Sequence, residues 1–445
     1  MEMERISAEP KIKVGICEGY GELRIILNGL CDLAGRLVSG PFRLVAAEGL
    51  ITVLDEEGKT LLRQREILFR PTPGATFTIG DVTIGVAFHW ERKQEETFLG
   101  DLRLIMTDDR KITAINEIGL EDYLASVISS EMNARAPEEF LKAHAIMSRS
   151  WLGAMVSREQ KKTPSPAAVT LPAGERLRWY DREEHGDFDV CADDHCQRYQ
   201  GLPEHHGGRA GAAVQATRGL FLTSDGEICD ARYHKACGGL TEEFATAWED
   251  KKVPYLTSVA DGAINYPPLH GEEGASAWIL ASPPAYCNTC DPRTLENILP
   301  SFDRETESFF RWQVSYCREE LEEIIASKAG VAIGNLTGLV PLSRGPSGRI
   351  FRLQLLGTKG SLIVGKELEI RRLLSRSHLL SSAFAVFVEG GSSRLPARFI
   401  LRGAGWGHGV GLCQIGAAVM ATQGRRAEEI LGHYFRGASL HKLYG

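Results

Sequence analysis

The sequence predicts an α+β fold, with a β-rich N-terminal part followed by a mixed α/β part that two insertions interrupt. Short β-prone runs occupy residues 11–115, two amphipathic helical stripes follow over 116–160, and strand-like and helix-like runs then mix up to the C-terminus. At 445 residues the chain needs more than one core, because single hydrophobic cores stop growing at roughly 250–300 residues.

Seven short β-prone runs fill the N-terminal part, and Gly and Asp-Glu-Glu-Gly turns separate them. The runs are residues 13–16, 23–27, 42–45, 51–54, 76–79, 82–86 and 102–106. We expect them to form one β-rich region, 1–115, whose last strand leads into a helix.

The next segment, 116–160, predicts that helix and a second, longer one. Leu120, Leu124 and Val127 recur at helical spacing, which favours a helix that ends near residue 130. After a short interruption, Pro137 suits the first position of the second helix, because its missing N–H would be unpaired there in any case. The many small residues of the second helix would let another element pack closely.

Glu131 lies between these two helices. At the C-terminal end of the first helix, unpaired carbonyl groups carry partial negative charge and disfavour a carboxylate. Partial burial would raise the pKa of Glu131 further, and a carboxyl group that stays protonated near neutral pH is what a general acid requires. The alternative is a surface glutamate in a helix–helix turn.

An irregular insertion, 161–215, follows the second helix and is rich in Pro, Gly, Asp and His. It contains His185, Cys191, His195 and Cys196. Two imidazoles and two thiolates suit tetrahedral zinc, and metal binding would order a loop that does not bury its own core. With four protein ligands the site would be closed and therefore structural. The alternative is a pair of free thiols beside surface histidines.

The rest of the chain mixes short strands with helices. Strands are expected at 220–223, 229–234, 255–259, 350–356 and 384–389, and helices at 319–328, 370–374, 413–423 and 427–434.

A second pair of cysteines, Cys287 and Cys290, has C-x-x-C spacing. A redox motif needs a strand-to-helix setting and a depressed thiol pKa. Here the pair follows Pro-Pro-Ala-Tyr and precedes Asp-Pro. Packed thiols or a local disulfide are therefore the preferred interpretations.

Tyr233 and His234 precede a glycine pair, Gly238 and Gly239. Two adjacent glycines let the backbone come close to a bound ligand. This segment is a weak candidate for a binding site.

A stronger motif lies near the C-terminus, where five glycines within nine residues surround Trp406 and His408 and lead into a helix that bears Gln414. Aromatic side chains commonly stack on sugar faces, and backbone and Gln groups bond hydroxyls. A phosphate-binding loop is excluded, because no Gly-Lys-Ser/Thr follows.

Three separated blocks of the chain resemble the SpoIID/LytB family. They are LEDYLASVISSEM with the helix PEEFLKAHAIMSRSW, then TRGLFLTSDGEICDARYHKACGGLTE, then GAGWGHGVGLCQIGA. Sporulation members of that family are lytic transglycosylases that act on peptidoglycan. The resemblance implies that Glu131 is the catalytic residue and that substrate is bound by Arg149, Tyr233, His234, Gly238, Gly239, Trp406, His408 and Gln414. Some relatives carry zinc in the insertion after the catalytic helix, which supports His185, Cys191, His195 and Cys196 as ligands.

On this resemblance, the protein would cleave the bond between N-acetylmuramic acid and N-acetylglucosamine and release a 1,6-anhydro product. A non-catalytic, peptidoglycan-binding enhancer of a cell-wall amidase is the alternative. A zinc hydrolase would need an open metal position, which four protein ligands do not leave. The expected segments are the β-rich part (1–115), the catalytic helices (116–160), the Cys/His insertion (161–215), the continued catalytic domain (216–264), an α/β insertion (265–396) and the C-terminal part (397–445).

Charge and composition exclude some classes of function. The net charge of −7 gives no reason to expect nucleic-acid binding, and no run of about 18 apolar residues predicts a membrane span. The segment MEMERISAEPKIKVGICEG lacks the apolar core of a secretory signal. The substrate class implied by the resemblance lies in the cell envelope or periplasm. Because no secretory signal is visible, either the chain stays inside the cell or its true N-terminus was trimmed or mis-assigned.

Overall fold

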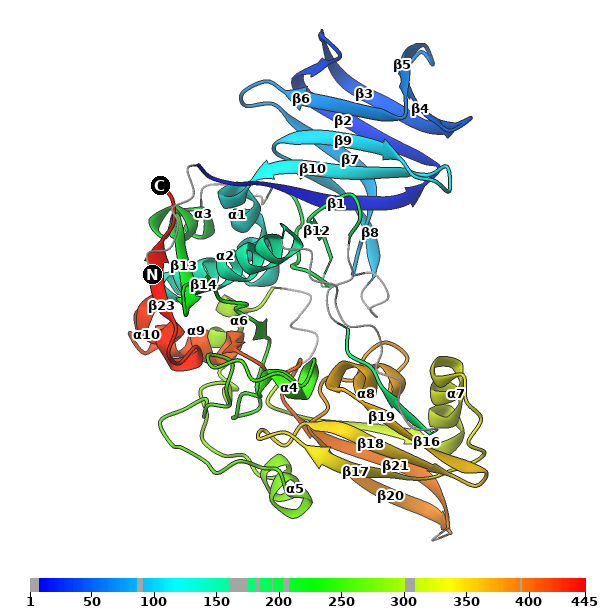
Figure 1. Ribbon diagram of the computed structural model, residues 1–445, viewed down its shortest axis with the longest axis vertical. Coiled ribbons are helices and arrows are strands. Elements are labelled where there is room, and N and C mark those ends of the chain that lie inside the picture. Colours follow the sequence, from blue (N-terminus) through cyan, green and yellow to red (C-terminus); the bar gives the residue numbers. More distant parts are fainter. Residues whose placement is uncertain are drawn as a thin grey trace. The chain divides into compact units, whose positions relative to one another are not determined.

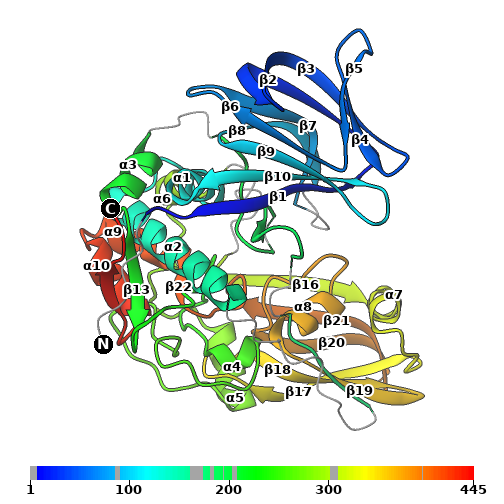
Figure 2. The same ribbon diagram turned by 45° about the horizontal axis from the view of Figure 1, so that its top comes forward.

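The computed structural model describes residues 8–85, 91–160, 174–180, 185–193, 195–202, 208–300, 309–392 and 394–445. The fold is mixed α and β with more strand than helix, and a large N-terminal sheet is confirmed. The chain divides into two compact units, coloured by sequence in Figures 1 and 2. The N-terminal unit comprises Glu4–Ala134, Glu184–Leu220 and Lys442–Gly445, and the C-terminal unit comprises Arg135–Glu183 and Phe221–His441.

One largely antiparallel sheet builds the N-terminal unit (Figure 1). Its strands are β1 (Lys11–Tyr20), β2 (Glu22–Leu33), β3 (Arg36–Ala47), β4 (Leu50–Leu54), β5 (Thr60–Gln64), β6 (Glu66–Pro71), β7 (Thr76–Ile84), β8 (Arg92–Phe98), β9 (Asp101–Met106), β10 (Ile112–Gly119) and β12 (Val190–Cys191). The long strand β2 pairs with β7 through its first half and with β6 through its second half. Alternate residues of β9 are buried, as expected for a sheet with one face on a core.

The predicted strands of this unit are confirmed, and two adjacent runs, 76–79 and 82–86, belong to the single strand β7 as far as Ile84. Val86 lies outside the described residues. The sequence prediction missed β5 and β8, because their exposed positions carry charged and amide side chains such as Arg63, Gln64 and Glu95 rather than β-branched ones. It also missed β6.

The first predicted helix is confirmed as α1 (Leu120–Glu131), which begins directly after β10. It packs against α3 (Arg209–Ala216). The buried carboxylate of Glu121 accepts hydrogen bonds from the Gly219 amide and the Tyr444 hydroxyl. These contacts tie the last residues of the chain to the start of α1.

The second predicted helix is α2 (Glu138–Gln160), and it contacts α9 (Gln414–Thr422) and α10 (Ala427–Tyr434) in the C-terminal unit. The small residues of α2 do permit close packing, because a Cβ on Gly153 would lie 2.9 Å from the Phe221 ring. Phe221 belongs to β13 (Leu220–Ser224), which pairs with β14 (Glu227–Ile228) and β23 (Ser439–Lys442).

Two further sheets enclose a large apolar core of the C-terminal unit. One is formed by β11 (Glu175–Leu177), β19 (Gly360–Gly365), β18 (Ile350–Gly357) and β17 (Leu336–Arg344), and the other by β16 (Arg311–Cys317), β21 (Leu395–Ala404) and β20 (Phe384–Ser392). Helices α7 (Arg318–Ala329) and α8 (Glu367–Leu373) contribute buried residues to this core. The strands and helices expected between 319 and 389 are therefore confirmed, to within a few residues at their ends.

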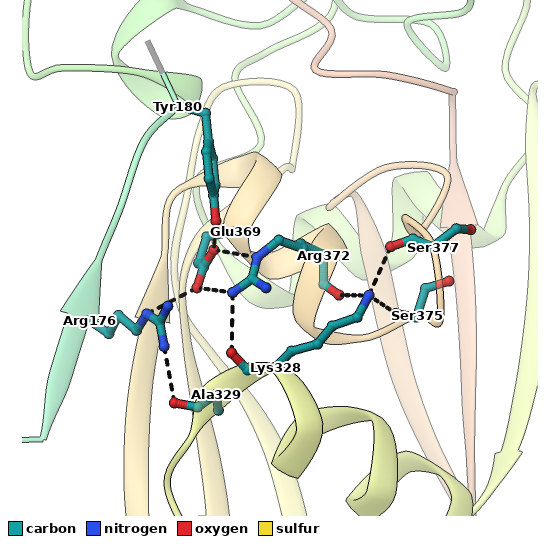
Figure 3. Close-up of polar contacts among 8 residues, drawn as sticks. All are labelled: Arg176, Tyr180, Lys328, Ala329, Glu369, Arg372, Ser375 and Ser377. Carbon is teal, nitrogen blue, oxygen red and sulfur yellow. Dashed lines mark hydrogen bonds and ion pairs between the residues drawn. The ribbon is translucent and has the colours of Figure 1, made fainter. Parts of the chain in front are cut away.

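Polar contacts fasten the described segment 174–180 to this part of the unit (Figure 3). The buried carboxylate of Glu369 on α8 accepts a hydrogen bond from Tyr180 and a two-point contact from Arg372, and Arg176 of β11 lies 3.1 Å away. The Lys328 ammonium of α7 lies 2.6–3.1 Å from four backbone carbonyl oxygens at and just beyond the end of α8. A buried carboxylate and a lysine thus join three segments that are distant in sequence.

The expected strand at 255–259 is wrong, because these residues form turns and coil. The Val259 amide donates to the Thr241 hydroxyl, and its carbonyl accepts from the Thr241 amide, so one residue satisfies both groups. Of the expected strand at 229–234, only β15 (Tyr233–His234) forms, because backbone hydrogen bonds between residues two apart turn the chain at 229–232.

Short helices α4 (Phe244–Ala247), α5 (Glu272–Leu280) and α6 (Pro292–Ile298) complete the unit. None of the helices in the described residues is long and apolar enough to cross a membrane.

Candidate functional site

Glu131 is the last residue of α1, as the sequence predicted, and only 7% of its surface is exposed. Its Oε1 accepts a hydrogen bond of 3.2 Å from the backbone N–H of Arg198. Because Glu131 is buried, the alternative of a surface glutamate is wrong. One carboxylate oxygen is held in place by a segment that is 67 residues away in sequence.

The four predicted metal ligands, His185, Cys191, His195 and Cys196, come together in the N-terminal unit, and we call them the His/Cys cluster. One ligand atom from each lies within 4.8 Å of the others. The Cys196 sulfur is 3.3 Å from Nε2 of His185 and 3.5 Å from Nδ1 of His195, and the Cys191 sulfur is 3.8 Å from the same Nδ1. Contacts from Cys196, and then from His185 and His195, lower the pKa of the Cys191 thiol. Two imidazoles and two thiols at these distances, one of them an easily ionised thiol, fit a tetrahedral zinc ion.

Strand β12 supports this cluster, because it pairs in parallel with β1 and contains Cys191. The Asp189 carboxylate accepts a hydrogen bond of 2.8 Å from the Lys13 amide. Phe188 fits against Gly15, where a Cβ would lie 2.5 Å from the ring. The missing side chain at Gly15 therefore lets the insertion lie directly on the sheet.

The residues after Cys196 join the His/Cys cluster to α1. Tyr199 stacks on Tyr123 of α1 with ring centroids 5.1 Å apart, and its hydroxyl donates to the Asn116 side chain at 2.6 Å. The Tyr123 hydroxyl contacts the Gln197 side chain at 3.3 Å. Arg198, the donor to Glu131, lies between these two anchored residues, so its amide is placed by its neighbours on both sides.

In the C-terminal unit, the glycine-rich loop lies against the Tyr233–Gly239 segment. Strands β15 and β22 (Leu412–Cys413) pair in parallel, and Trp406 and Ala236 exchange two backbone hydrogen bonds of 2.7 and 3.1 Å. A Cβ on Gly238 would lie 2.9 Å from the Gly405 amide. The structure thus brings together the two glycine-containing segments that the sequence singled out.

The backbone of Val410 orients two predicted histidines. His234 donates from Nδ1 to the Val410 carbonyl at 3.1 Å, whereas Nδ1 of His408 accepts from the Val410 amide at 3.0 Å. Burial, with the nearby Arg349 guanidinium, lowers the pKa of His234 to about 3. Burial, with His234 and Arg232, lowers the pKa of His408 well below its ordinary value. Both rings are therefore neutral at pH 7, and Nε2 of His234 is a buried acceptor with no hydrogen-bond partner among the described residues.

Three residues that the sequence prediction missed shape the same region. The Trp248 ring lies 4.9 Å from His408 and beneath the Arg232 guanidinium at 4.2 Å. The fully buried Arg349 donates to the carbonyls of Gly407 and Cys237. His144 of α2 has Nε2 at 3.0 Å from the Gln414 amide and its ring 5.3 Å from Tyr233. No local spacing marks these residues, because each reaches the loop from a distant part of the chain.

Trp406 is half-buried, and one face of its indole stacks on Phe309 at 5.2 Å and 20°. Arg149 is fully buried in α2. Gly239 lies under Trp278, with a would-be Cβ 2.8 Å from that ring. The eight predicted substrate-binding residues belong to the C-terminal unit, whereas Glu131 and the His/Cys cluster belong to the N-terminal unit.

A local disulfide between Cys287 and Cys290 is wrong, because both cysteines are free, Cys287 being buried and Cys290 exposed. The packed-thiol interpretation holds for Cys287 alone. Cys287 instead meets side chains from other parts of the unit.

Comparisons with known proteins agree with the resemblance. A family model described as Stage II sporulation protein, SpoIID, matches residues 108–224, and one described as a domain of unknown function, DUF8618, matches 242–411. The chain is 24% identical over 327 residues to Stage II sporulation protein D of Bacillus amyloliquefaciens, which covers 74% of this chain and 75% of that protein. It is 22% identical over 330 residues to Stage II sporulation protein D of Bacillus subtilis, covering 74% and 76%. An uncharacterized protein of Brachyspira hyodysenteriae is 24% identical over 343 residues, covering 77% and 72%. The SpoIID match includes Glu131, Arg149 and the His/Cys cluster.

Proposed function

Because this chain belongs to the SpoIID family, we propose that it is a lytic transglycosylase that cleaves glycan strands of peptidoglycan. Glu131 protonates the glycosidic oxygen between N-acetylmuramic acid and N-acetylglucosamine. The resulting carboxylate then takes the proton from the muramic 6-hydroxyl as that oxygen bonds to C1. Most glycosidases need a second carboxyl group to activate water or to attack the sugar. Here the hydroxyl of the substrate replaces water, so one carboxyl group serves both steps.

The setting of Glu131 carries this proposal. A general acid–base must hold its oxygens at a fixed place, and it must not be so strongly solvated that it stays ionised. The 7% exposure of Glu131 and its position at the carbonyl end of α1 both disfavour the charged form. The hydrogen bond from the Arg198 amide favours the charged form and fixes Oε1. These opposing influences suit a group that has to be an acid in one step and a base in the next.

Zinc held by the His/Cys cluster would have a structural role in this enzyme. Four protein ligands fill a tetrahedral ion and leave no position for water or substrate. The ion would instead fix Cys196, two residues before the amide that contacts Glu131. The cluster therefore supports the catalytic residue without touching the glycan.

We assign glycan binding to the glycine-rich loop and its neighbours. The half-exposed Trp406 is already stacked on Phe309 and presents the rest of its surface to a sugar ring. His234, His408, Tyr233, Gln414 and Arg149, with the backbone at Gly238 and Gly239, shape and orient the loop that carries it. Neutral imidazoles suit hydroxyl groups: with Nδ1 of each ring bonded to the Val410 backbone, Nε2 of His234 remains an acceptor and Nε2 of His408 remains a donor.

The test is the incubation of purified glycan strands with the protein, followed by mass spectrometry of the products. The parent should release 1,6-anhydro-muramic ends. Glu131→Gln keeps the shape of the side chain but does not deliver a proton, so the rate should fall by about 10²–10⁴-fold while the fold and glycan binding persist. Cleavage by Glu131→Gln at the parental rate would remove Glu131 from the mechanism. Reducing muramic ends from the parent would indicate a hydrolase, and retained binding with no cleavage would favour the amidase-enhancer function.

A further inference from the structure

Four side chains in the C-terminal unit form a second cluster that the function above does not use: Cys237, Asp261, Cys287 and Cys413. One ligand atom from each lies within 4.8 Å of the others. All four residues are at most 2% exposed. The sulfurs of Cys237 and Cys287 are 3.5 Å apart, and neither is in a disulfide. Tetrahedral zinc with bonds of about 2.3 Å to sulfur places two thiolates roughly 3.8 Å apart, so the observed spacing fits one shared ion.

Backbone amides point at two of these sulfurs. The amides of Cys237 and Gly416 donate to the Cys413 sulfur at 3.3 and 3.4 Å, and the Gly239 amide donates to the Cys237 sulfur at 3.3 Å. A neutral thiol is a weak acceptor, whereas amide donors stabilise a thiolate. Cys413 also caps the N-terminus of α9, where the helix dipole favours negative charge. The amide donors and the N-terminus of α9 therefore suit sulfurs that carry negative charge, as metal-bound thiolates do.

The carboxylate is oriented in the same way. The Oδ2 atom of Asp261 accepts from the Cys287 amide at 2.8 Å, and Oδ1 accepts from the Tyr434 hydroxyl at 2.6 Å. A Cβ on Gly416 would lie 2.1 Å from that Oδ1, so glycine is required for the approach of α9. Hydrogen bonds that hold a ligating carboxylate are a usual part of metal sites.

Ionised sulfurs at this site would need a cation. The amide donors favour thiolates, and burying several ionised groups together without a counter-charge is very unfavourable. Two guanidinium groups lie near the cluster. Arg311 donates to the carbonyls of Gly238, Trp278, Ala281 and Phe310, and Arg349 donates to those of Cys237 and Gly407. These hydrogen bonds direct both groups to backbone carbonyls rather than to the sulfurs.

We propose that Cys237, Asp261, Cys287 and Cys413 bind a second structural zinc ion in this protein. Three sulfurs and one oxygen in a closed set favour zinc over hard cations such as magnesium or calcium. The ion would join the turn at Gly238 and Gly239, the coil around Asp261, the coil before α6 and the start of α9. It would thereby fasten the glycine-rich loop to the segment that carries Tyr233 and His234.

The first test measures zinc per chain by inductively coupled plasma mass spectrometry, in full-length protein purified without added metal. The parent should contain two ions, and Cys287→Ser and Cys191→Ser should contain one each. Cys290→Ser is the matched control, because Cys290 is exposed, lies three residues from Cys287 and should leave both ions in place. Parental zinc content in Cys287→Ser would overturn the proposal.

A second measurement leaves the proposed site unaltered and so avoids a folding defect caused by Cys287→Ser. Cys191→Ser, in which only the second cluster is complete, is first freed of its bound zinc with a chelator and is then titrated with cobalt(II). Visible bands of tetrahedral cobalt and near-ultraviolet absorption from three thiolates should appear at one equivalent. Their absence, or an intact mass that is 2 Da lower because Cys237 and Cys287 form a disulfide, would overturn the proposal. Neither readout uses glycan cleavage, so the site and the proposed enzyme activity succeed or fail separately.

Discussion

The contact between Arg198 and Glu131 makes the proposed activity depend on the His/Cys cluster. Cys191→Ser tests this dependence, because it removes one of four ligands and leaves Glu131 and Arg198 unchanged. The zinc ion of the His/Cys cluster should be lost, and the segment that follows Cys196 should lose its attachment to that ion. Gln197, whose side chain contacts the Tyr123 hydroxyl, and Tyr199, which stacks on Tyr123 and bonds Asn116, still hold the segment.

The structure sets the size of the expected effect. A hydrogen bond to a charged group contributes about 1.5–3 kcal/mol. At about 1.4 kcal/mol per factor of ten, complete loss of the Arg198 bond in the transition state would slow cleavage by roughly 10- to 150-fold. Because Tyr199 still holds its end of the segment, we expect the lower part of that range. Removal of the acid itself in Glu131→Gln should cost more, about 10²–10⁴-fold.

The assay quantifies anhydro-muropeptide release by liquid chromatography and mass spectrometry, beside the zinc content of the same preparation. Cys317→Ser is the control, since Cys317 is exposed and belongs to neither cluster. Limited proteolysis should show faster cutting within 161–209 in Cys191→Ser and unchanged cutting elsewhere. A variant that has lost the zinc ion of the His/Cys cluster and still cleaves at the parental rate would refute the coupling of this cluster to Glu131.

Three further predictions concern the C-terminal unit. Trp406→Ala should weaken glycan binding in a pull-down assay and lower the free energy of unfolding by about 0.5–1.5 kcal/mol through loss of the Phe309 pair; unchanged binding would exclude stacking on sugar. Gly409→Ala should destabilise the protein in urea by more than Gly424→Ala, because both have positive φ but only at Gly409 would a Cβ meet the Arg349 guanidinium, at 2.4 Å. Stability should fall as the pH drops from about 6.5 towards 4, because the unfolded state protonates His234 and His408 near pH 6.5 whereas the fold keeps both neutral. A His408→Gln variant should show a shallower pH dependence, and an unchanged slope would contradict this assignment.

The spacing of residues along the sequence predicted the helices, strands and metal ligands whose determining residues are close together in the chain. Helix α1 ends at Glu131, and the sequence indicates this end without any tertiary information, because residues 133–136 interrupt the apolar stripe. The His/Cys cluster was predictable because its four ligands fall within twelve residues of one another. Strand β8 was missed because polar and apolar residues do not alternate along it: Arg92, Lys93 and Glu95 are exposed, and even the buried Glu96 is charged.

Residues that act across long separations were not predictable in this way. Arg349 donates to the carbonyl of Gly407 in the glycine-rich loop, 58 residues away, and to the carbonyl of Cys237, 112 residues away. Cys237 and Cys413 meet across 176 residues. In the sequence, Cys287 is paired most naturally with Cys290, whereas the fold turns one inward and the other to solvent. A C-x-x-C spacing therefore misled the prediction where the true partners came from other segments.

The two proposed zinc sites both lie in segments that have little regular secondary structure. Segments 185–202 and 235–291 contain little regular structure within their described residues, so few ladder hydrogen bonds hold them in place. Each segment nevertheless has to position groups with precision at a helix end: the Arg198 amide at the C-terminus of α1, and the Gly238–Gly239 turn near the N-terminus of α9. A closed zinc site adds strong, directional bonds without requiring a hydrophobic core, because its binding free energy becomes folding free energy. Loss of either ion should therefore disturb the irregular segment first and the surrounding sheets and helices much less.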